Sequence, residues 1–230
     1  MININNISKR YNDLVIFDNF NLTIEEGKIS CFLGESGCGK STLLNMICGT
    51  VHSDKGYIEG LNNNFSYIFQ DTRLLPWATV EENIKFVLKN ISKKDADYIT
   101  NKYLDIVKLS QYKEYYPKQL SGGMKQRVSI ARAFAYKSEV LLMDEPFKGL
   151  DTSLKLDLIK SFIQLWEEDK RTVLFVTHDI EEALLLSDYI YIFKGRPVVI
   201  KDNIKIDIDK LDRLKSRKQL DIYRHSLAKY

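Results

Sequence analysis

The chain has 230 residues, 34 of them basic and 31 acidic, and its formal net charge is +3 at pH 7. This length is enough for one large domain or two small lobes with a buried core. The excess of positive charge is small, and nothing in the sequence resembles the concentrated basic face of a nucleic-acid-binding protein. No apolar run approaches the ~20 residues that cross a bilayer, and the polar N-terminus is unlike a signal peptide, so we expect a soluble cytosolic protein.

Residues 1–33 show a broken alternation of apolar and polar positions, which is typical of β-strands. Tyr11 ends the first predicted strand, just before an Asn12-Asp13 turn. An aromatic ring in this position can stack on an adenine ring. Propensity alone indicates a half-buried strand tyrosine equally well.

A glycine-rich loop follows the apolar run 29–33 and opens onto a helical pattern. It matches the phosphate-binding pattern G-x-x-x-x-G-K-[ST] at every fixed position. Its residues are Gly34, Glu35, Ser36, Gly37, Cys38, Gly39, Lys40, Ser41 and Thr42. The glycines let main-chain N–H groups close around phosphate oxygens, and the helix N-terminus adds positive potential. We expect Lys40 to reach the β- and γ-phosphates and Ser41 to ligate Mg²⁺.

Two further strands are predicted, at 57–58 and 65–69, separated by an Asn-rich turn. The second strand ends at Gln70, and an apolar loop that contains Trp77 follows it.

Helix signals dominate the next segment. Thr79 and Glu82 form a capping box, and Ser92 with Asp95 forms a second cap. Apolar residues recur at helical spacing after each cap. We therefore predict a helical lobe over about residues 79–136, inserted between strands of the core.

A Ser-Gly-Gly turn opens an alanine-rich helix near the end of this lobe. Ser121, Gly122 and Gly123 would present free N–H groups and a hydroxyl on one side, which suits an anion. Ordinary helix capping is the commoner explanation of such a turn.

Two apolar runs, 140–143 and 172–176, are typical of buried parallel strands, and polar residues follow each of them. Ligands bind at the carboxyl ends of strands in open α/β sheets. We expect Asp144 to hold Mg²⁺ through water, Glu145 to orient or deprotonate an attacking water, and His178 to contact a γ-phosphate. The alternatives are a solvated turn, which the apolar run before Asp144 disfavours, and a structural role for the histidine.

More helices and strands complete the pattern. Asp151 is predicted to cap a long amphipathic helix, and Asp179 with Glu182 to cap the next. The runs 189–193 and 198–200 flank a hairpin-like turn.

The C-terminal segment, 205–230, is predicted to contain a last strand and a basic helical tail. Ile204, Ile206 and Ile208 alternate as that strand. From Lys210 onward seven basic residues accompany two acidic ones, which favours a solvated helix over a membrane-surface or partner-binding role.

Together these patterns predict an α/β fold in one domain, 1–230. Its core would be that of a P-loop NTPase, a mixed and mainly parallel sheet with flanking helices. An N-terminal antiparallel β subdomain and the inserted α-helical lobe would complete it.

The order of the motifs resembles that of ATP-binding cassette proteins over roughly residues 1–200, and the Ser-Gly-Gly element is far more diagnostic than the phosphate loop. The motifs are 34–42, Gln70, 120–127, 144–146, 149–151 and His178. The stretch 74–84 is similar to the ATPase subunits of nitrate, sulfonate and taurine importers, and importers of pyrimidine precursors carry similar sequences. One departure is that Lys148-Gly149 stands where these importers often have Gly-Ala.

The resemblance implies ATP and Mg²⁺ as cofactors. Tyr11 would stack on adenine, and residues 34–42 would bind the phosphates. Gln70 would lie near Mg²⁺ and link the site to a membrane subunit. Glu145 would be the general base, and His178 would sense the γ-phosphate.

The resemblance also implies partners. Ser121 and Gly123 would contact the γ-phosphate of a nucleotide held by a second copy, and Asp151 would cross the interface between the copies. The chain would be the peripheral motor, on the cytoplasmic face of the membrane, of an importer with a transmembrane permease and, indirectly, a solute-binding protein. The alternatives are a soluble cassette ATPase unconnected with transport and a phosphate-loop kinase, which the Ser-Gly-Gly element and His178 disfavour.

The apolar loop before the lobe allows two interpretations. Leu74, Leu75, Pro76 and Trp77 would line a groove that receives a short helix of the membrane subunit. Alternatively, Trp77 packs into the helical lobe, since most large aromatic side chains lie in the core.

Overall fold

The larger of two sheets carries the strand ends at which the sequence predicts a site. The computed structural model describes residues 1–62, 64–89 and 91–229. Within these residues the larger sheet has the strand order β5-β6-β7-β3-β8-β9, and all neighbours are parallel except β8 and β9. The strands are β3 (Ile29–Gly34), β5 (Phe65–Ile68), β6 (Val140–Asp144), β7 (Thr172–Thr177), β8 (Tyr189–Lys194) and β9 (Val199–Lys205).

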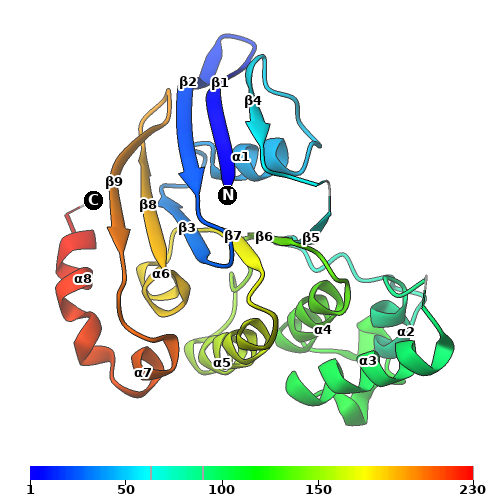
Figure 1. Cartoon of the computed structure of the whole chain (residues 1–230). Coiled ribbons are helices and arrows are strands. Elements are labelled where there is room, and N and C mark those ends of the chain that lie inside the picture. The colour runs from blue at the N-terminus through cyan, green and yellow to red at the C-terminus, as the bar shows by residue number, and fades with distance from the viewer. Residues whose placement is uncertain (63, 90, 230) are drawn as a thin grey trace.

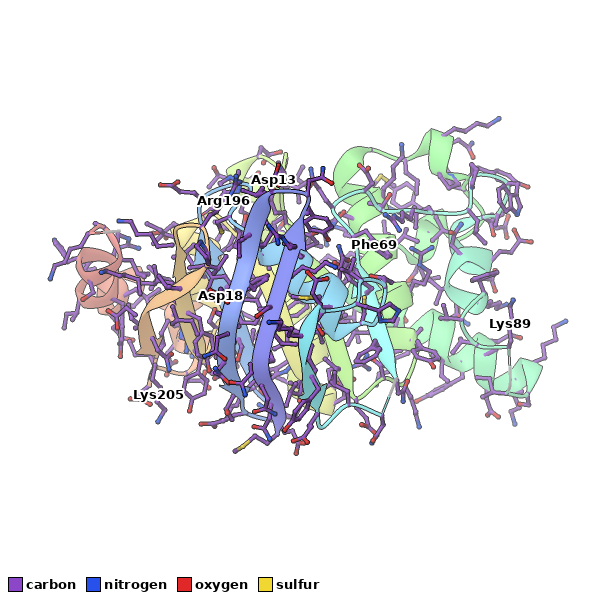
Figure 2. All side chains as sticks on the ribbon, turned by 90° about the horizontal axis from the view of Figure 1, so that it is seen from above. Asp13, Asp18, Phe69, Lys89, Arg196 and Lys205 are labelled. Atoms are coloured by element: carbon purple, nitrogen blue, oxygen red, sulfur yellow. The ribbon has the colours of Figure 1, made fainter. Side chains whose placement is uncertain are left out.

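A smaller antiparallel sheet with the order β2-β1-β4 covers one face of this core. Its strands are β1 (Ile2–Tyr11), β2 (Leu14–Ile24) and β4 (Lys55–Glu59). Figure 2 shows it crossing the middle of the molecule, with a group of helices on one side and the C-terminal helices on the other. The predicted N-terminal antiparallel unit is therefore present, with β4 added to the strands of residues 1–33.

The helices surround the larger sheet (Figure 1). The α-helices are α1 (Lys40–Ile47), α2 (Val80–Lys85), α3 (Lys93–Ile106), α4 (Gly122–Ala135), α5 (Thr152–Asp169), α6 (Ile180–Leu186), α7 (Lys210–Lys215) and α8 (Asp221–Leu227). The short 3₁₀ helices are η1 (Ser110–Tyr112), η2 (Pro117–Gln119) and η3 (Arg217–Leu220).

Alternate side chains of the central strands enter two separate cores, because successive residues of a strand point to opposite faces. Leu142 and Leu174 pack with the smaller sheet and α1. Leu141 and Val173 pack with α4, α5 and α6 on the other face. The central strands are thus buried on both sides, which explains their continuous apolar runs.

The helices α2, α3 and α4 lie between β5 and β6 in the chain and form a group beside the sheet (Figure 1). The predicted capping box is confirmed: Thr79 Oγ1 accepts from the Glu82 N–H at 3.2 Å, and Glu82 Oε2 accepts from the Thr79 N–H at 2.7 Å. The second cap is confirmed too, since Ser92 Oγ accepts from the Asp95 N–H at 3.1 Å.

The predictions for the last strand need correction. Instead of short strands at 198–200 and 204–208, one strand, β9, runs from Val199 to Lys205. Ile206 is buried and lies beyond its end, so the alternation of the isoleucines reflects burial after the strand as well as strand structure. The predicted Asn-rich turn includes residue 63 and lies partly outside the described residues.

The prediction of a solvated tail is wrong for the first tail helix, which is anchored in the core. The guanidinium of Arg213 is buried and donates to the carbonyl oxygens of Ile208, Leu184, Ser187 and Ile206. These bonds join α7 to the end of α6 and to the chain after β9. Basic composition predicted solvation, but buried carbonyl groups at these chain ends require donors. In the described part of the chain, no helix combines the length and apolarity of a membrane span.

Candidate active site

The glycine-rich loop between β3 and α1 depends on its glycines. Gly37 and Gly39 have backbone φ values of 77° and 119°, which other residues rarely adopt. A Cβ atom at Gly39 would lie 2.7 Å from a methyl carbon of Ile16, and one at Gly34 would lie 2.6 Å from the carbonyl oxygen of Phe193. The backbone angle therefore favours glycine at positions 37 and 39, and the lack of space for a Cβ atom requires it at positions 34 and 39.

The side chain of Lys40 folds back into this loop. The residue is buried, and its Nζ donates to the carbonyl oxygens of Gly34 and Glu35, at 2.7 Å in each case. The ammonium thus lies inside the loop whose N–H groups are expected to face an anion. It supplies positive charge where the sequence predicts phosphate.

Asp144 meets the loop at the end of β6. The Ser41 hydroxyl donates to Asp144 Oδ1 at 2.9 Å, which joins two of the three predicted Mg²⁺ ligands. Burial raises the pKa of the Asp144 carboxyl above its ordinary value, and the bond from Ser41 opposes this effect only in part. A partly buried carboxylate with so little compensation favours a nearby cation.

The donor set fits Mg²⁺. Ser41, Asp144 and Gln70 offer oxygen atoms, which Mg²⁺ prefers, and Gln70 follows β5, the strand next to β6. The described residues contain no group of three or more His, Cys, Asp or Glu that could hold a metal. Mg²⁺ is usually held by one or two protein ligands together with substrate phosphates.

Glu145 lies beside His178, at the ends of the neighbouring strands β6 and β7. His178 Nδ1 is 3.3 Å from Glu145 Oε1, and the backbone N–H of Glu145 donates to the carbonyl oxygen of Val176 at 3.0 Å. The backbone φ of Glu145 is 44°, an uncommon value for a residue with a side chain. Burial raises the pKa of Glu145, but Lys148 and His178 outweigh burial and the net pKa lies below the ordinary value.

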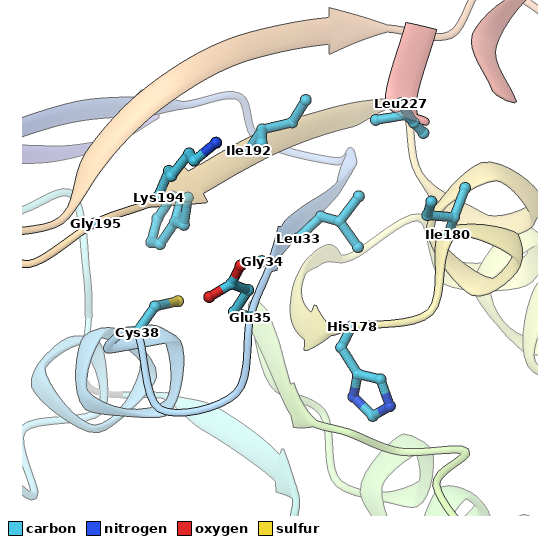
Figure 3. A pocket seen from close by; sticks show the side chains of 11 residues that line it. Leu33, Gly34, Glu35, Cys38, His178, Ile180, Ile192, Lys194, Gly195 and Leu227 are labelled. Carbon is cyan, nitrogen blue, oxygen red and sulfur yellow. The ribbon is translucent and has the colours of Figure 1, made fainter. Parts of the chain in front are cut away.

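A cavity of about 230 Å³ joins the glycine-rich loop to His178 (Figure 3). Glu35, Cys38 and His178 line it, with apolar walls from β8 and the tail residue Leu227.

Tyr11 does not line this cavity; its ring is partly exposed, with Lys9 Nζ 5.3 Å from the ring centre. With 44% of the residue exposed at the end of β1, the ring agrees with a half-buried strand tyrosine as well as with the stacking hypothesis.

The Ser-Gly-Gly turn stays separate from the loop within one copy of the chain. Ser121 is the N-cap of α4 and accepts from the Met124 N–H at 3.3 Å. Among the described residues, no hydrogen bond or ion pair joins Ser121, Gly122 or Gly123 to residues 34–42. The helix they begin is nevertheless tied to the catalytic region, because Gln126 Nε2 donates to the carbonyl oxygen of Pro146.

Asp151 and Asp179 are helix caps, as predicted. Asp151 accepts from the N–H groups of Ser153 and Leu154 at the start of α5. Asp179 accepts from the N–H groups at the start of α6. The predicted cap role of Glu182 is wrong: its carboxylate is buried, accepts from Thr177 Oγ1 at 2.7 Å and pairs with Lys155 at 2.7 Å.

Sequence reasoning missed three basic residues around the site. Lys148 pairs with Glu145 at 2.6 Å, Lys155 bridges α5 to Asp179 and Glu182, and Arg196 donates to the carbonyl oxygen of Gly37. Only Lys148 had a signal in the sequence, because it departs from the resembled motif three residues after Glu145.

The chain is similar to known proteins along most of its length. A family model described as ABC transporter matches residues 17–148. The nitrate import ATP-binding protein of Synechocystis sp. is 40% identical over 204 residues, which cover 85% of this chain and 77% of that protein. The aliphatic sulfonates import ATP-binding protein of Bacillus thuringiensis is 39% identical over 227 residues, which cover 91% of this chain and 89% of that protein.

A solved structure is also similar. It is the dimeric post-hydrolysis state of an ATP-binding cassette bound to ADP and Pi. It matches with a TM-score of 0.79 at 28% sequence identity, over 91% of this chain and 100% of the other.

We predict that Lys40→Ala lowers ATP affinity at least about tenfold, because charge-assisted contacts to phosphate contribute ~1.5–3 kcal/mol each. Titration calorimetry with ATP measures the change, and Lys93→Ala, at an exposed lysine of α3, is the control. An unchanged dissociation constant in the folded Lys40→Ala variant would refute phosphate binding by the loop.

Proposed function

Because the chain belongs to the ABC transporter family and is one of its ATPases, we propose that it is the motor subunit of an importer. Two copies would close around ATP and drive uptake of a small solute through a separate membrane subunit. The solute class would be that of nitrate, sulfonate or taurine importers, or of pyrimidine-precursor importers. The observation that carries the proposal is the meeting of the glycine-rich loop, Asp144, Glu145 and His178 at one edge of the sheet.

The site residues would divide binding from chemistry. Lys40 would turn from the loop carbonyls to the β- and γ-phosphates, while Ser41, Asp144 and Gln70 would hold Mg²⁺. Mg²⁺, when bound, would neutralise charge on the phosphate oxygens.

Hydrolysis would take place beside Glu145. Glu145 would accept a proton from the attacking water as the water oxygen bonds to the γ-phosphorus and the bond to the β–γ bridging oxygen breaks. His178 would contact the γ-phosphate from the neighbouring strand. Its ring nitrogen lies 3.3 Å from Glu145 Oε1, so the two side chains would face the same γ-phosphate.

A second copy would complete the site. The exposed N-terminus of α4 and the separation of Ser121 and Gly123 from the loop within one copy support this proposal. In a two-copy arrangement these residues would face the γ-phosphate bound to the partner, with Asp151 at the interface. The similarity to a dimeric cassette bound to ADP and Pi supports it as well. ATP would then stabilise the closed state, because it contacts both copies only in that state.

The loop before α2 would contact the membrane subunit. The side chain of Trp77 is 74% exposed, which disfavours packing in the lobe. Buried Asn83 holds the loop backbone through bonds to Leu75, Ala78 and Thr79, so the exposed indole projects from a fixed segment. An exposed large aromatic residue on a rigid support is typical of a binding surface.

The docking surface would also include a hollow of about 980 Å³ between β5 and the helical lobe. Phe86, Tyr98 and Tyr136 are among its lining residues. Residues 74–77 are not among the lining residues of this hollow, and Leu74 packs against the core. Trp77 comes before the start of α2 in the chain, and Phe86 comes just after its end. A short helix of the membrane subunit could therefore contact both.

A physical link would connect this surface to the ATP site. Arg132 of α4 donates to the carbonyl oxygens of Thr72 and Arg73, and the Arg73 guanidinium lies 3.6 Å from the centre of the Phe69 ring. Gln70 lies between these anchored residues. Movement of the helical lobe on docking would therefore be transmitted to Gln70. The chain would sit at the cytoplasmic face of the membrane and serve a solute-binding protein only indirectly.

Glu145→Gln keeps the side-chain shape and removes the base, so turnover should fall at least about 100-fold while ATP still binds. ATP should then hold two copies together, as measured by size-exclusion chromatography with light scattering. Glu114→Gln, at an exposed carboxylate of the lobe, is the control and should hydrolyse ATP normally. A variant that stays monomeric with ATP and still hydrolyses it would contradict both proposed roles.

Trp77→Asp should leave the melting temperature and the ATPase rate of the isolated chain unchanged, and abolish co-purification of the membrane subunit and solute uptake. Trp166→Ala is the buried comparison, because truncating a buried large aromatic residue costs ~3–5 kcal/mol of folding free energy. Mass spectrometry of proteins captured from native membranes, together with thermal melts, decides the question. Intact association, or a collapsed melting temperature for Trp77→Asp, refutes docking through Trp77.

A further inference from the structure

Lys148 makes a direct contact with Glu145 that the shared motifs do not require. Its Nζ lies 2.6 Å from Glu145 Oε2, and its backbone N–H donates to the carbonyl oxygen of Glu145 at 3.2 Å. On the other side of the carboxylate, His178 Nδ1 lies 3.3 Å from Oε1. Each carboxylate oxygen therefore has one nitrogen partner, and the two partners come from different segments.

Gly149 lies in the turn that follows Lys148, which the Leu150 N–H closes on the carbonyl oxygen of Phe147 at 3.4 Å. Gly149 has a backbone φ of 76°, and a Cβ there would meet nothing within 4 Å. Space does not exclude a side chain at this position, so the left-handed backbone conformation is what favours glycine. Lys148 itself ends the preceding turn, 145–148, so its approach to Glu145 comes from that turn, and Gly149 sets the direction of the chain after it.

The carboxylate of Glu145 needs this partner. The side chain is only 11% exposed, and Oε2 is buried without a hydrogen bond of good geometry among the described residues, so its contact with Lys148 Nζ is an ion pair. A carboxylate shielded from water is costly unless it is paired. The Lys148 side chain is 45% exposed, so it supplies the charge from the solvent side.

We propose that Lys148 is a positioning residue for the general base, holding Glu145 Oε2 so that Oε1 stays directed toward His178 and the attacking water. The proposal rests on the proposed function of Glu145 and adds a residue to it. A carboxylate fixed in one orientation spends more time in a reactive arrangement than one free to rotate. Lys148 acts through Glu145 and does not contact the nucleotide, so its loss should affect turnover and leave ATP binding unchanged.

Steady-state ATP hydrolysis by the full chain tests this proposal. Lys148→Met keeps the length of the side chain and removes its charge; we expect kcat to fall about tenfold, with KM for ATP unchanged within about twofold. Lys148→Arg restores a cation and should recover most of kcat. Lys160→Met, at an exposed lysine of α5, is the matched control and should leave both constants unchanged.

A double-mutant cycle shows whether Lys148 acts through Glu145. In single-turnover measurements, adding Lys148→Met to Glu145→Gln should cause no further loss of rate. If the melting temperature of Lys148→Met is markedly lower than that of the unmodified chain, Lys148→Gln replaces it in the same measurements, with the same expected results for kcat and KM.

Several results would overturn the proposal. They are an unchanged or increased kcat for Lys148→Met, an increased KM for ATP, failure of Lys148→Arg to recover activity, or a further loss in the double variant. The failure of the proposed function is distinguishable, because the unmodified chain would then show no ATP hydrolysis. If the unmodified chain hydrolyses ATP and Lys148→Met matches it, only the positioning role fails.

Discussion

Parallel pairing of three strands is the constraint on which the site depends, because it brings their carboxyl ends to one edge. Leu33 of β3 lies beside Thr177 of β7, and Val176 of β7 lies beside Asp144 of β6. A slip of one residue in either pair would turn the side chains of that strand to the opposite face. The two-sided burial of these strands resists such a slip, since each face has its own core. Packing far from the site therefore sets the geometry of its polar groups.

The two neighbouring carboxylates at this edge, Asp144 and Glu145, differ in how well their negative charges are compensated. Glu145 has two partners, Lys148 and His178, whereas Asp144 has the hydroxyl of Ser41. Burial raises the pKa of Asp144 and the Ser41 bond offsets this only in part, whereas at Glu145 Lys148 and His178 outweigh burial and lower the pKa. Asp144, whose charge is less compensated, belongs to the candidate metal site. Glu145, whose charge is well compensated, is the candidate base. Neighbouring residues with such different surroundings can divide metal binding from proton transfer.

The sequence predicted features with a local physical cause and missed those that depend on distant partners. The loop glycines and the capping box at Thr79 were predictable, because backbone angles and free N–H groups at helix ends demand particular residues. The burial of Arg213 was not, since its acceptors come from α6 and from the chain after β9. Glu182 looked like a cap because of its spacing from Asp179, but Thr177 and Lys155 hold it instead. No local pattern carries that information.

In the proposed two-copy site, one copy supplies the glycine-rich loop and the other supplies the Ser-Gly-Gly turn. Mixing two inactive variants, each damaged in a different one of these parts, tests this arrangement directly. Lys40→Ala and Ser121→Arg should each abolish ATP hydrolysis by damaging different halves of every site. Mixing the two inactive variants should restore roughly a quarter of the unmodified rate, because random pairing in a two-fold dimer regenerates that share of intact sites. If both variants are folded and the mixture stays inactive, the two-copy site is contradicted.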